Sequence, residues 1–295
     1  MRFRFGIPFC LVLPLALFGQ AHVVVTAEGH HGAAPPPITK DEVEVQVDRH
    51  PAAVSDWVAL RGDDANLELY VVIDDGDDSD LGLQFGDLRS FMAAQPATTK
   101  IGLAYLQNGA ARVVAPMTAD HEAVSKALRS PLAQPGISSS PYMGISDLIK
   151  KWPAANARRE VLLIASGIDP WSPPDPQDIY LQKSIADAQR AGIVVNSIYF
   201  PEAGHLGHSY FRANWGQNYL SELAEGTGGE LYWSQGLANP VSVAPYLKDL
   251  ALRLENQYLM TLDIPKQKEE LEPLRVQSAK AGISLVAASK VDCGK

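Results

Sequence analysis

The residues best suited to chemistry form a short acidic loop. Residues 74–80 read Asp-Asp-Gly-Asp-Asp-Ser-Asp, which places five carboxylates within seven positions. Carboxylates at this density repel one another unless a cation or solvent offsets their charge. Hard oxygen ligands of this kind suit Mg²⁺, Ca²⁺ or Mn²⁺. The loop follows a continuous apolar run at 67–73, which predicts a buried strand with the acids at its carboxyl end.

Two further loops are predicted to lie beside the acidic loop. Each follows a buried apolar run, and they span residues 166–176 and 201–216. Loops at the carboxyl ends of parallel strands open on one face of the sheet. Because tryptophan is enriched at interface hot spots, Trp171 and Trp215 predict a partner-binding face there.

The elements that must position these loops alternate between strands and helices. The strands are expected at 67–73, 101–106, 161–165 and 193–199, and the helices at 81–94, 120–128, 143–152, 178–191, 218–224 and 243–254. This alternation predicts an α/β fold with a doubly wound, mostly parallel, Rossmann-like sheet and helices on both faces. The strand at 67–73 is expected to be central, and Asn108-Gly109 predicts a tight hairpin after the strand at 101–106.

The first 27 residues have the pattern of a signal peptide. Arg2 and Arg4 precede an apolar run at 5–18, and small residues at 19–21 or 25–27 offer a cleavage end. This pattern predicts a secreted or periplasmic protein with no stable membrane span after cleavage. Cys293 would then be the one remaining cysteine, which excludes an internal disulfide and a cysteine metal site.

The rest of the chain divides by composition and periodicity. We expect a small antiparallel strand pair in the C-terminal part, where two strand-like runs flank a charged stretch. The predicted boundaries are a proline-rich linker at 28–40, an N-terminal edge-strand segment at 41–64, the α/β domain at 65–257 and a C-terminal β extension at 258–295.

Charge argues against a polyanionic partner. The formal net charge is −9, and removal of residues 1–27 takes away two arginines and no acid, which leaves about −11. A strongly acidic chain is repelled by nucleic acid and by anionic membranes. The expected partner is therefore another protein.

The acidic loop and the strand before it resemble the first strand of von Willebrand factor A-type (vWA-like) domains. The strand ends in Val-Val-Ile-Asp, and that family places a metal-ion-dependent adhesion site there with the pattern Asp-x-Ser-x-Ser. Asp74 matches the leading aspartate, while Gly76 and Asp78 stand where the two serines would be. The resemblance covers roughly residues 65–255, rests mainly on the order of elements, and extends to the bacterial secreted vWA-related proteins.

The remaining positions of that adhesion site are also altered. A serine at 138–140, such as Ser140, stands in place of the family's threonine, and Ser166 stands where the family has an aspartate. Asp169, three residues later, replaces that aspartate only if the loop takes a different path. The resemblance therefore implies a degenerate site, with Mg²⁺ or Ca²⁺ held weakly or not at all by Asp74, Asp78 and Ser140. No fixed cofactor is expected.

These observations favour a protein-interaction module over an enzyme. The predicted binding residues are Asp74, Gly76, Asp78, Ser140, Ser166, Asp169, Trp171 and Trp215. One alternative is a serine hydrolase-like enzyme that uses Ser166 with His205 or His208 as the base, and another is a structural envelope protein. A hydrolase requires a histidine nitrogen within hydrogen-bond reach of Ser166 and a carboxylate nearby.

Overall fold

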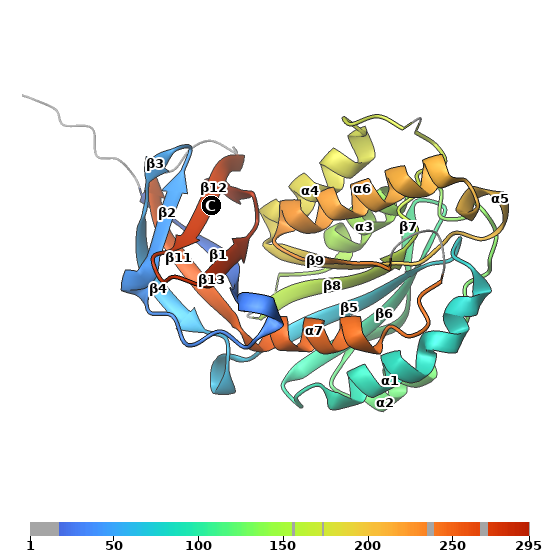
Figure 1. The fold of residues 1–295 in the computed structure, drawn as a ribbon, viewed down its shortest axis with the longest axis horizontal. Coiled ribbons are helices and arrows are strands. Elements are labelled where there is room, and N and C mark those ends of the chain that lie inside the picture. Colours follow the sequence, from blue (N-terminus) through green and yellow to red (C-terminus); the bar gives the residue numbers. More distant parts are fainter. Residues whose placement is uncertain (1–17, 155–156, 173, 235–238, 266–270, 295) are drawn as a thin grey trace, which may run out of the picture.

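The computed structural model describes residues 18–154, 157–172, 174–234, 239–265 and 271–294. An α/β unit and an all-β unit lie side by side (Figure 1). The sheet of the α/β unit has the order β7-β6-β5-β8-β9-β10, and every neighbouring pair is parallel except β6 with β7. Its strands are β5 (Leu67–Asp74), β6 (Thr99–Gln107), β7 (Ala110–Thr118), β8 (Arg158–Ala165), β9 (Ile193–Tyr199) and β10 (Leu231–Tyr232).

Helices cover both faces of this sheet (Figure 1). One face is covered by α1 (Phe85–Ala94), α2 (His121–Lys126) and α7 (Ala244–Glu255). The other is covered by α3 (Pro141–Lys151), α4 (Ile179–Ala191) and α6 (Tyr210–Thr227). The short helices η4 (Ser79–Gln84) and α5 (Gly204–Gly207) lie in the loops after β5 and β9.

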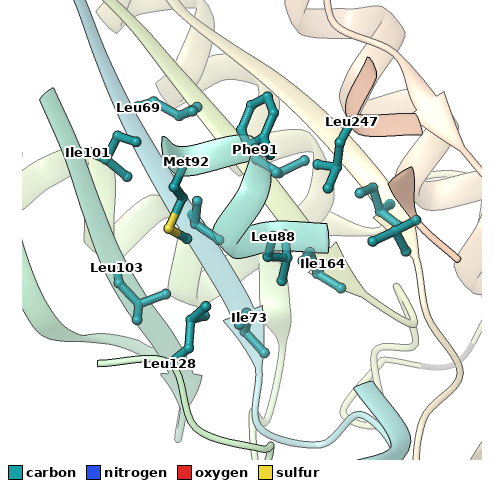
Figure 2. Packing of buried hydrophobic residues seen from close by; sticks show 14 of the residues in the cluster. Leu69, Ile73, Leu88, Phe91, Met92, Ile101, Leu103, Leu128, Ile164 and Leu247 are labelled. Atoms are coloured by element: carbon teal, nitrogen blue, oxygen red, sulfur yellow. The ribbon is translucent and has the colours of Figure 1, made fainter. Parts of the chain in front are cut away.

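Successive side chains of β5 are buried on opposite faces of the sheet, as expected for a central strand. Leu69 and Ile73 face the cluster formed with α1 and α7, whereas Tyr70 and Val72 face the cluster formed with α3, α4 and α6. Figure 2 shows the side chains of α1 packed against β5 and β6, with Leu247 of α7 beside them. Each fully buried aliphatic side chain contributes about 1.5–3 kcal/mol. A strand buried on both faces is expected to be mainly apolar, and β5 has the apolar run that the sequence predicted.

The predicted fold class is confirmed. The four predicted strands lie in one sheet, and β5 lies between β8 and β6. The hairpin between β6 and β7 turns at Asn108 and Gly109, with φ values of +51° and +67°. Two positive φ values match the tight type I′ turn that an Asn-Gly pair favours.

The prediction of a loop throughout 201–216 is wrong from Tyr210 onward. Helix α6 begins at that residue, where the Ser209 hydroxyl accepts a hydrogen bond from the Arg212 N–H at 3.4 Å. It ends at Gly228, which takes a left-handed conformation. Glycine and aromatic residues near its start obscure the helical period, because they have weak helix propensity.

The all-β unit is larger than the expected C-terminal strand pair. It contains two four-stranded sheets, ordered β13-β1-β11-β4 and β14-β12-β2-β3, which share one apolar core. The strands are β1 (Phe18–Gly29), β2 (Val43–Val47), β3 (His50–Pro51), β4 (Ala53–Ala59), β11 (Gln257–Pro265), β12 (Leu271–Ser278), β13 (Ile283–Ala287) and β14 (Lys290–Asp292). Both ends of the chain therefore build one unit.

Strand β1 overlaps the segment predicted to be a signal peptide. Residues 1–17, including nearly all of the apolar run, lie outside the described residues. From Phe18 to Thr26, β1 pairs with β11, and Val25 and Ala27 are buried in the all-β unit. A cleavage end at 25–27 would remove most of this strand, whereas one at 19–21 would leave most of it.

The proline-rich stretch at 28–40 is packed at its end rather than free. Ile38 is buried, its N–H donates to the Tyr258 hydroxyl at 3.2 Å, and its carbonyl accepts from the Trp57 indole at 3.0 Å. The rings of Trp57 and Tyr258 stack at 4.7 Å. Composition alone predicts polyproline conformation but does not reveal a single apolar anchor.

Within the part of the chain that is described, no helix has the length and apolarity needed to cross a membrane.

Candidate functional site

The candidate site lies where the strand order reverses. The chain proceeds from β5 to β6 on one side and from β8 to β9 on the other. Doubly wound sheets bind ligands at the carboxyl ends of the strands at such a point. Asp74 is the last residue of β5, and Ser166 directly follows β8.

One acid of the loop at 74–80 has a structural role. Asp75 forms a two-point ion pair with Arg129, at 2.6 and 2.7 Å, and accepts from the Gln107 amide at 2.6 Å. The Arg129 guanidinium also lies 3.8 Å from the centre of the Tyr105 ring. Paired in this way, the buried Asp75 charge is stabilised, and Asp75 fixes the start of the loop.

Three other carboxyl groups form a buried cluster, which we call the carboxyl cluster: Asp74, Asp77 and Glu202. Asp74 accepts from the Gly76 N–H at 2.8 Å, and Asp77 accepts from the Ser166 N–H at 3.0 Å. An antiparallel bridge between Asp77 and Glu202 brings the loop after β9 onto the acidic loop. Two backbone hydrogen bonds, both 2.9 Å, reinforce this contact: Asp78 N–H to Pro201 and Ala203 N–H to Gly76.

Glu202 joins three loops. One of its oxygens accepts from the Gly136 N–H at 2.6 Å, and the other accepts from the Ser166 hydroxyl at 3.1 Å. Sequence reasoning missed this residue. The available signal was an acid three residues after a buried strand, the same pattern that identified the acidic loop.

Burial raises the pKa values of all three groups of the carboxyl cluster. Desolvation, followed by the charge of Glu202, raises the pKa of Asp74 to about 8. Desolvation and the charges of Asp74 and Glu202 raise the pKa of Asp77 well above its ordinary value. Desolvation raises the pKa of Glu202 to about 7, although the bonds from Gly136 and Ser166 act in the opposite direction. In the described chain, the ion pairs of the acidic loop involve Asp75 alone.

The residues present differ from the metal-binding pattern of the family that the sequence resembles. No three Asp, Glu, His or Cys side chains among the described residues are grouped to hold a metal ion. Asp78, an expected ligand, is partly exposed and instead caps η4 by accepting from the Asp80 N–H at 2.9 Å. Where the family pattern has an aspartate, this chain has Ser166, and the Ser166 hydroxyl donates a hydrogen bond to Glu202. In the carboxyl cluster, Asp74 and Asp77 each have one buried carboxyl oxygen with no hydrogen-bond partner among the described residues.

Ser140 and Asp169 are both buried and lie near one another. Burial raises the pKa of Asp169, and the Ser140 hydroxyl opposes this rise, although the two groups do not reach hydrogen-bond geometry. The other Asp169 oxygen accepts from the N–H groups of Trp171 and Ser172 at 2.8 and 3.1 Å. Asp169 therefore shapes the loop at 166–176.

The two predicted tryptophans have different environments. Trp171 is 71% exposed at the tip of its loop. Trp215 lies on α6, partly buried, between Phe211 at 6.4 Å and Tyr219 at 5.6 Å. Tyr210 and Phe211 belong to the loop range 201–216 predicted for the binding face, and they are 72% and 61% exposed at the start of α6.

Close contact between backbones holds α6 against the loop after β8. Gly167 has a φ of +69°, and a Cβ atom there would lie 2.3 Å from the Gly216 carbonyl oxygen. The Tyr219 hydroxyl also exchanges hydrogen bonds of 2.8 Å with the backbone of Asp175. The exposed start of α6 and the loop bearing Trp171 are thus tied to one scaffold.

Ser166 does not have the surroundings of a nucleophile. It is fully buried, donates to Glu202 and accepts from the Ile168 N–H at 3.2 Å. No histidine of the described residues forms a hydrogen bond with it. Among the described residues, the predicted pairing of Ser166 with His205 or His208 is therefore not present.

No protein-family model and no curated protein matches the sequence. The similar solved structures include an aerotolerance-related membrane protein from Bacteroides fragilis (13% identity, 64% of this chain and 98% of that one, TM-score 0.46). They also include BatB from Bacteroides thetaiotaomicron (12%, 63% and 97%, 0.45) and a von Willebrand factor type A protein from Catenulispora acidiphila (11%, 94% and 75%, 0.43).

The identification of the domain rests on its own topology. Counted within the α/β unit, the strands follow the doubly wound order 3-2-1-4-5-6. The third strand is antiparallel, and the acidic loop follows the first. By the order and direction of its strands, the α/β unit has a doubly wound fold, as expected from the resemblance of its first strand to that of vWA-like domains.

Proposed function

We propose that the chain is a secreted or periplasmic interaction module that binds a protein partner through the loops at the carboxyl ends of its parallel strands. The single observation that carries the proposal is the anchoring of three loops at this end of the sheet by Glu202. Its hydrogen bonds and backbone bridge join the loops that hold Gly136, Ser166 and Asp77. A pre-organised surface loses little conformational entropy on binding.

Exposed aromatic side chains on this scaffold support a protein as the ligand. Trp171, Tyr210 and Phe211 are all more than 60% exposed. Large aromatic side chains are enriched at interface hot spots, and an exposed apolar patch commonly marks an interaction site. The exposed Asp80 and the acidic net charge favour a partner surface with basic groups.

The geometry does not favour the two alternatives. A hydrolase is not supported because Ser166 is buried and bonded to a carboxyl group. A purely structural envelope protein would not require its loops to be anchored together. We therefore propose a role in binding, with no catalytic residue and no required metal.

The test is partner capture with matched variants. The full chain is cross-linked in an extract of the cells that produce it, and the partner is identified by mass spectrometry. Its affinity is then measured for Trp171→Ala and Phe211→Ala. Val114→Ala is the control, since Val114 is 44% exposed on the edge strand β7.

We expect each aromatic variant to weaken binding by roughly 1–4 kcal/mol without changing the thermal unfolding temperature. Trp215→Ala is a poorer probe because that ring is partly buried. Equal affinity of both exposed-aromatic variants and the control would place the recognition surface elsewhere.

A further inference from the structure

A cavity lies between the two units, at the opposite end of the sheet from the acidic loop. Its volume is about 550 Å³, within the range typical of small-molecule sites. The α/β unit contributes the amino ends of β8 and β9, and the all-β unit contributes β1, β4 and β14. Val23, Val58 and Leu259 supply apolar lining.

Arg158, the first residue of β8, lines this cavity. Its Nε and one terminal nitrogen are buried and have no hydrogen-bond partner among the described residues. Arginine stays charged in proteins, and a buried charge without partners is strongly unfavourable. Desolvation by burial lowers the pKa of Arg158, and the charge of Glu160 acts in the opposite direction.

No carboxylate of the described residues forms a direct ion pair with this guanidinium. Glu160 attracts it through space; one Glu160 oxygen accepts from the Asn196 amide at 2.9 Å, and the other is buried without a hydrogen-bond partner among the described residues. No ion pair of Arg158 is formed within 4.0 Å in the described part of the chain. The long rotatable stem of arginine allows its head group to turn toward an anion in the cavity.

The surrounding charge also favours an anion. Arg159, Arg190 and Lys290 line the same cavity, whereas its acids are Asp64 and Asp292. The Arg159 guanidinium donates to the backbone carbonyls of Trp152 and Ala191, so it is held in place without a carboxylate partner among the described residues.

Apolar room is available beside the same guanidinium. Arg158 and Leu60 also line a second cavity of about 940 Å³ between α1 and α7. Phe91, Leu247 and Leu254 are among its lining residues. A ligand with a charged head and an apolar body matches this combination.

We propose that the cavity between the two units binds a small amphipathic organic anion whose carboxylate or phosphate group lies against Arg158. The ligand would contact both units, so its binding would hold them together. This site is separate from the proposed partner-binding face, and it stands or fails independently of that proposal.

The test measures binding of defined anions to the full chain. Octanoate, octyl phosphate, citrate and inorganic phosphate are titrated by calorimetry, and thermal unfolding is followed in parallel with chloride at matched ionic strength. We expect octanoate or octyl phosphate to bind and to raise the unfolding temperature above the chloride reference. Tighter binding of octanoate identifies a carboxylate ligand, and tighter binding of octyl phosphate identifies a phosphate ester.

Variants assign the binding to Arg158. Arg158→Gln should weaken binding roughly 10- to 100-fold, the effect of losing hydrogen bonds to a charged group. Arg112→Gln, an exposed arginine on β7, is the matched control and should bind normally. Val58→Trp fills the cavity without changing charge and should also abolish binding, which covers the case in which Arg158→Gln fails to fold.

Two results would overturn the proposal. One is the absence of stabilisation by octanoate and octyl phosphate beyond the chloride reference, whether or not citrate or inorganic phosphate binds. The other is wild-type affinity in folded Arg158→Gln or in folded Val58→Trp.

Discussion

Replacing Asp74 with asparagine should make the protein more stable at mildly alkaline pH. Asp74 is 1% exposed, and its pKa is raised to about 8 by desolvation and by the charge of Glu202. The unfolded chain releases the same proton near pH 4. Between these two values the folded state binds more protons than the unfolded state, so the stability of the wild type falls as the pH rises.

The size of the effect follows from the width of that window. A single group with this shift costs about 1.4 kcal/mol per pH unit, which amounts to roughly 4 kcal/mol between pH 5 and pH 8. Asparagine does not titrate, and its amide oxygen can still accept from the Gly76 N–H. Asp74→Asn should therefore match the wild type near pH 5 and exceed its free energy of unfolding by roughly 4 kcal/mol at pH 8.

Urea unfolding followed by circular dichroism at pH 5, 6, 7 and 8 measures this difference. Asp78→Asn is the matched control, since its side chain is partly exposed and only caps η4. The control should follow the wild-type pH dependence. A wild-type stability that stays level or rises between pH 5 and pH 8 would refute the account of the carboxyl cluster, as would an Asp74→Asn variant with no advantage at pH 8.

Two further predictions concern metal and processing. Calorimetry with Mg²⁺, Mn²⁺ and Ca²⁺ should show binding weaker than micromolar. The reason is that Asp78 caps η4 and the Ser166 hydroxyl donates to Glu202, so neither is arranged as a metal ligand. A tighter site that is abolished by Asp74→Ala would contradict this prediction. If the chain is exported and processed, the mass of the mature protein should correspond to cleavage at 19–21, which leaves the buried Val25 in β1. A mature chain that begins after 25–27 would show that β1 is dispensable.

The main sheet could be predicted because its signals are local. A strand covered on both faces is apolar over most of its length, so β5, β8 and β9 are recognisable without knowledge of their neighbours. The Asn108-Gly109 turn is equally local, since it depends on the positive φ values those two residues tolerate. The start of α6 was not predicted, because the Gly and aromatic residues near Tyr210 do not show a clear helical period.

The carboxyl cluster illustrates what the sequence determined only in part. The density of acids at 74–80 marked this loop as the place for chemistry. Which acid turns inward is a matter of backbone geometry: Asp77 faces Ser166, whereas its neighbour Asp78 caps η4. Spacing along the chain does not distinguish these two residues.

The sequence by itself determined the α/β class, the central strand and the face on which the loops open. Strands buried on both faces are seen as continuous apolar runs, and the alternation of strands with helices indicates that the strands are parallel. The tertiary structure alone decided which distant residues meet. Glu202 joins the acidic loop to Ser166, and β1 completes a sheet with β11 across more than two hundred intervening residues. Such contacts depend on how whole elements pack, and the individual residues carry no local pattern that names their partners.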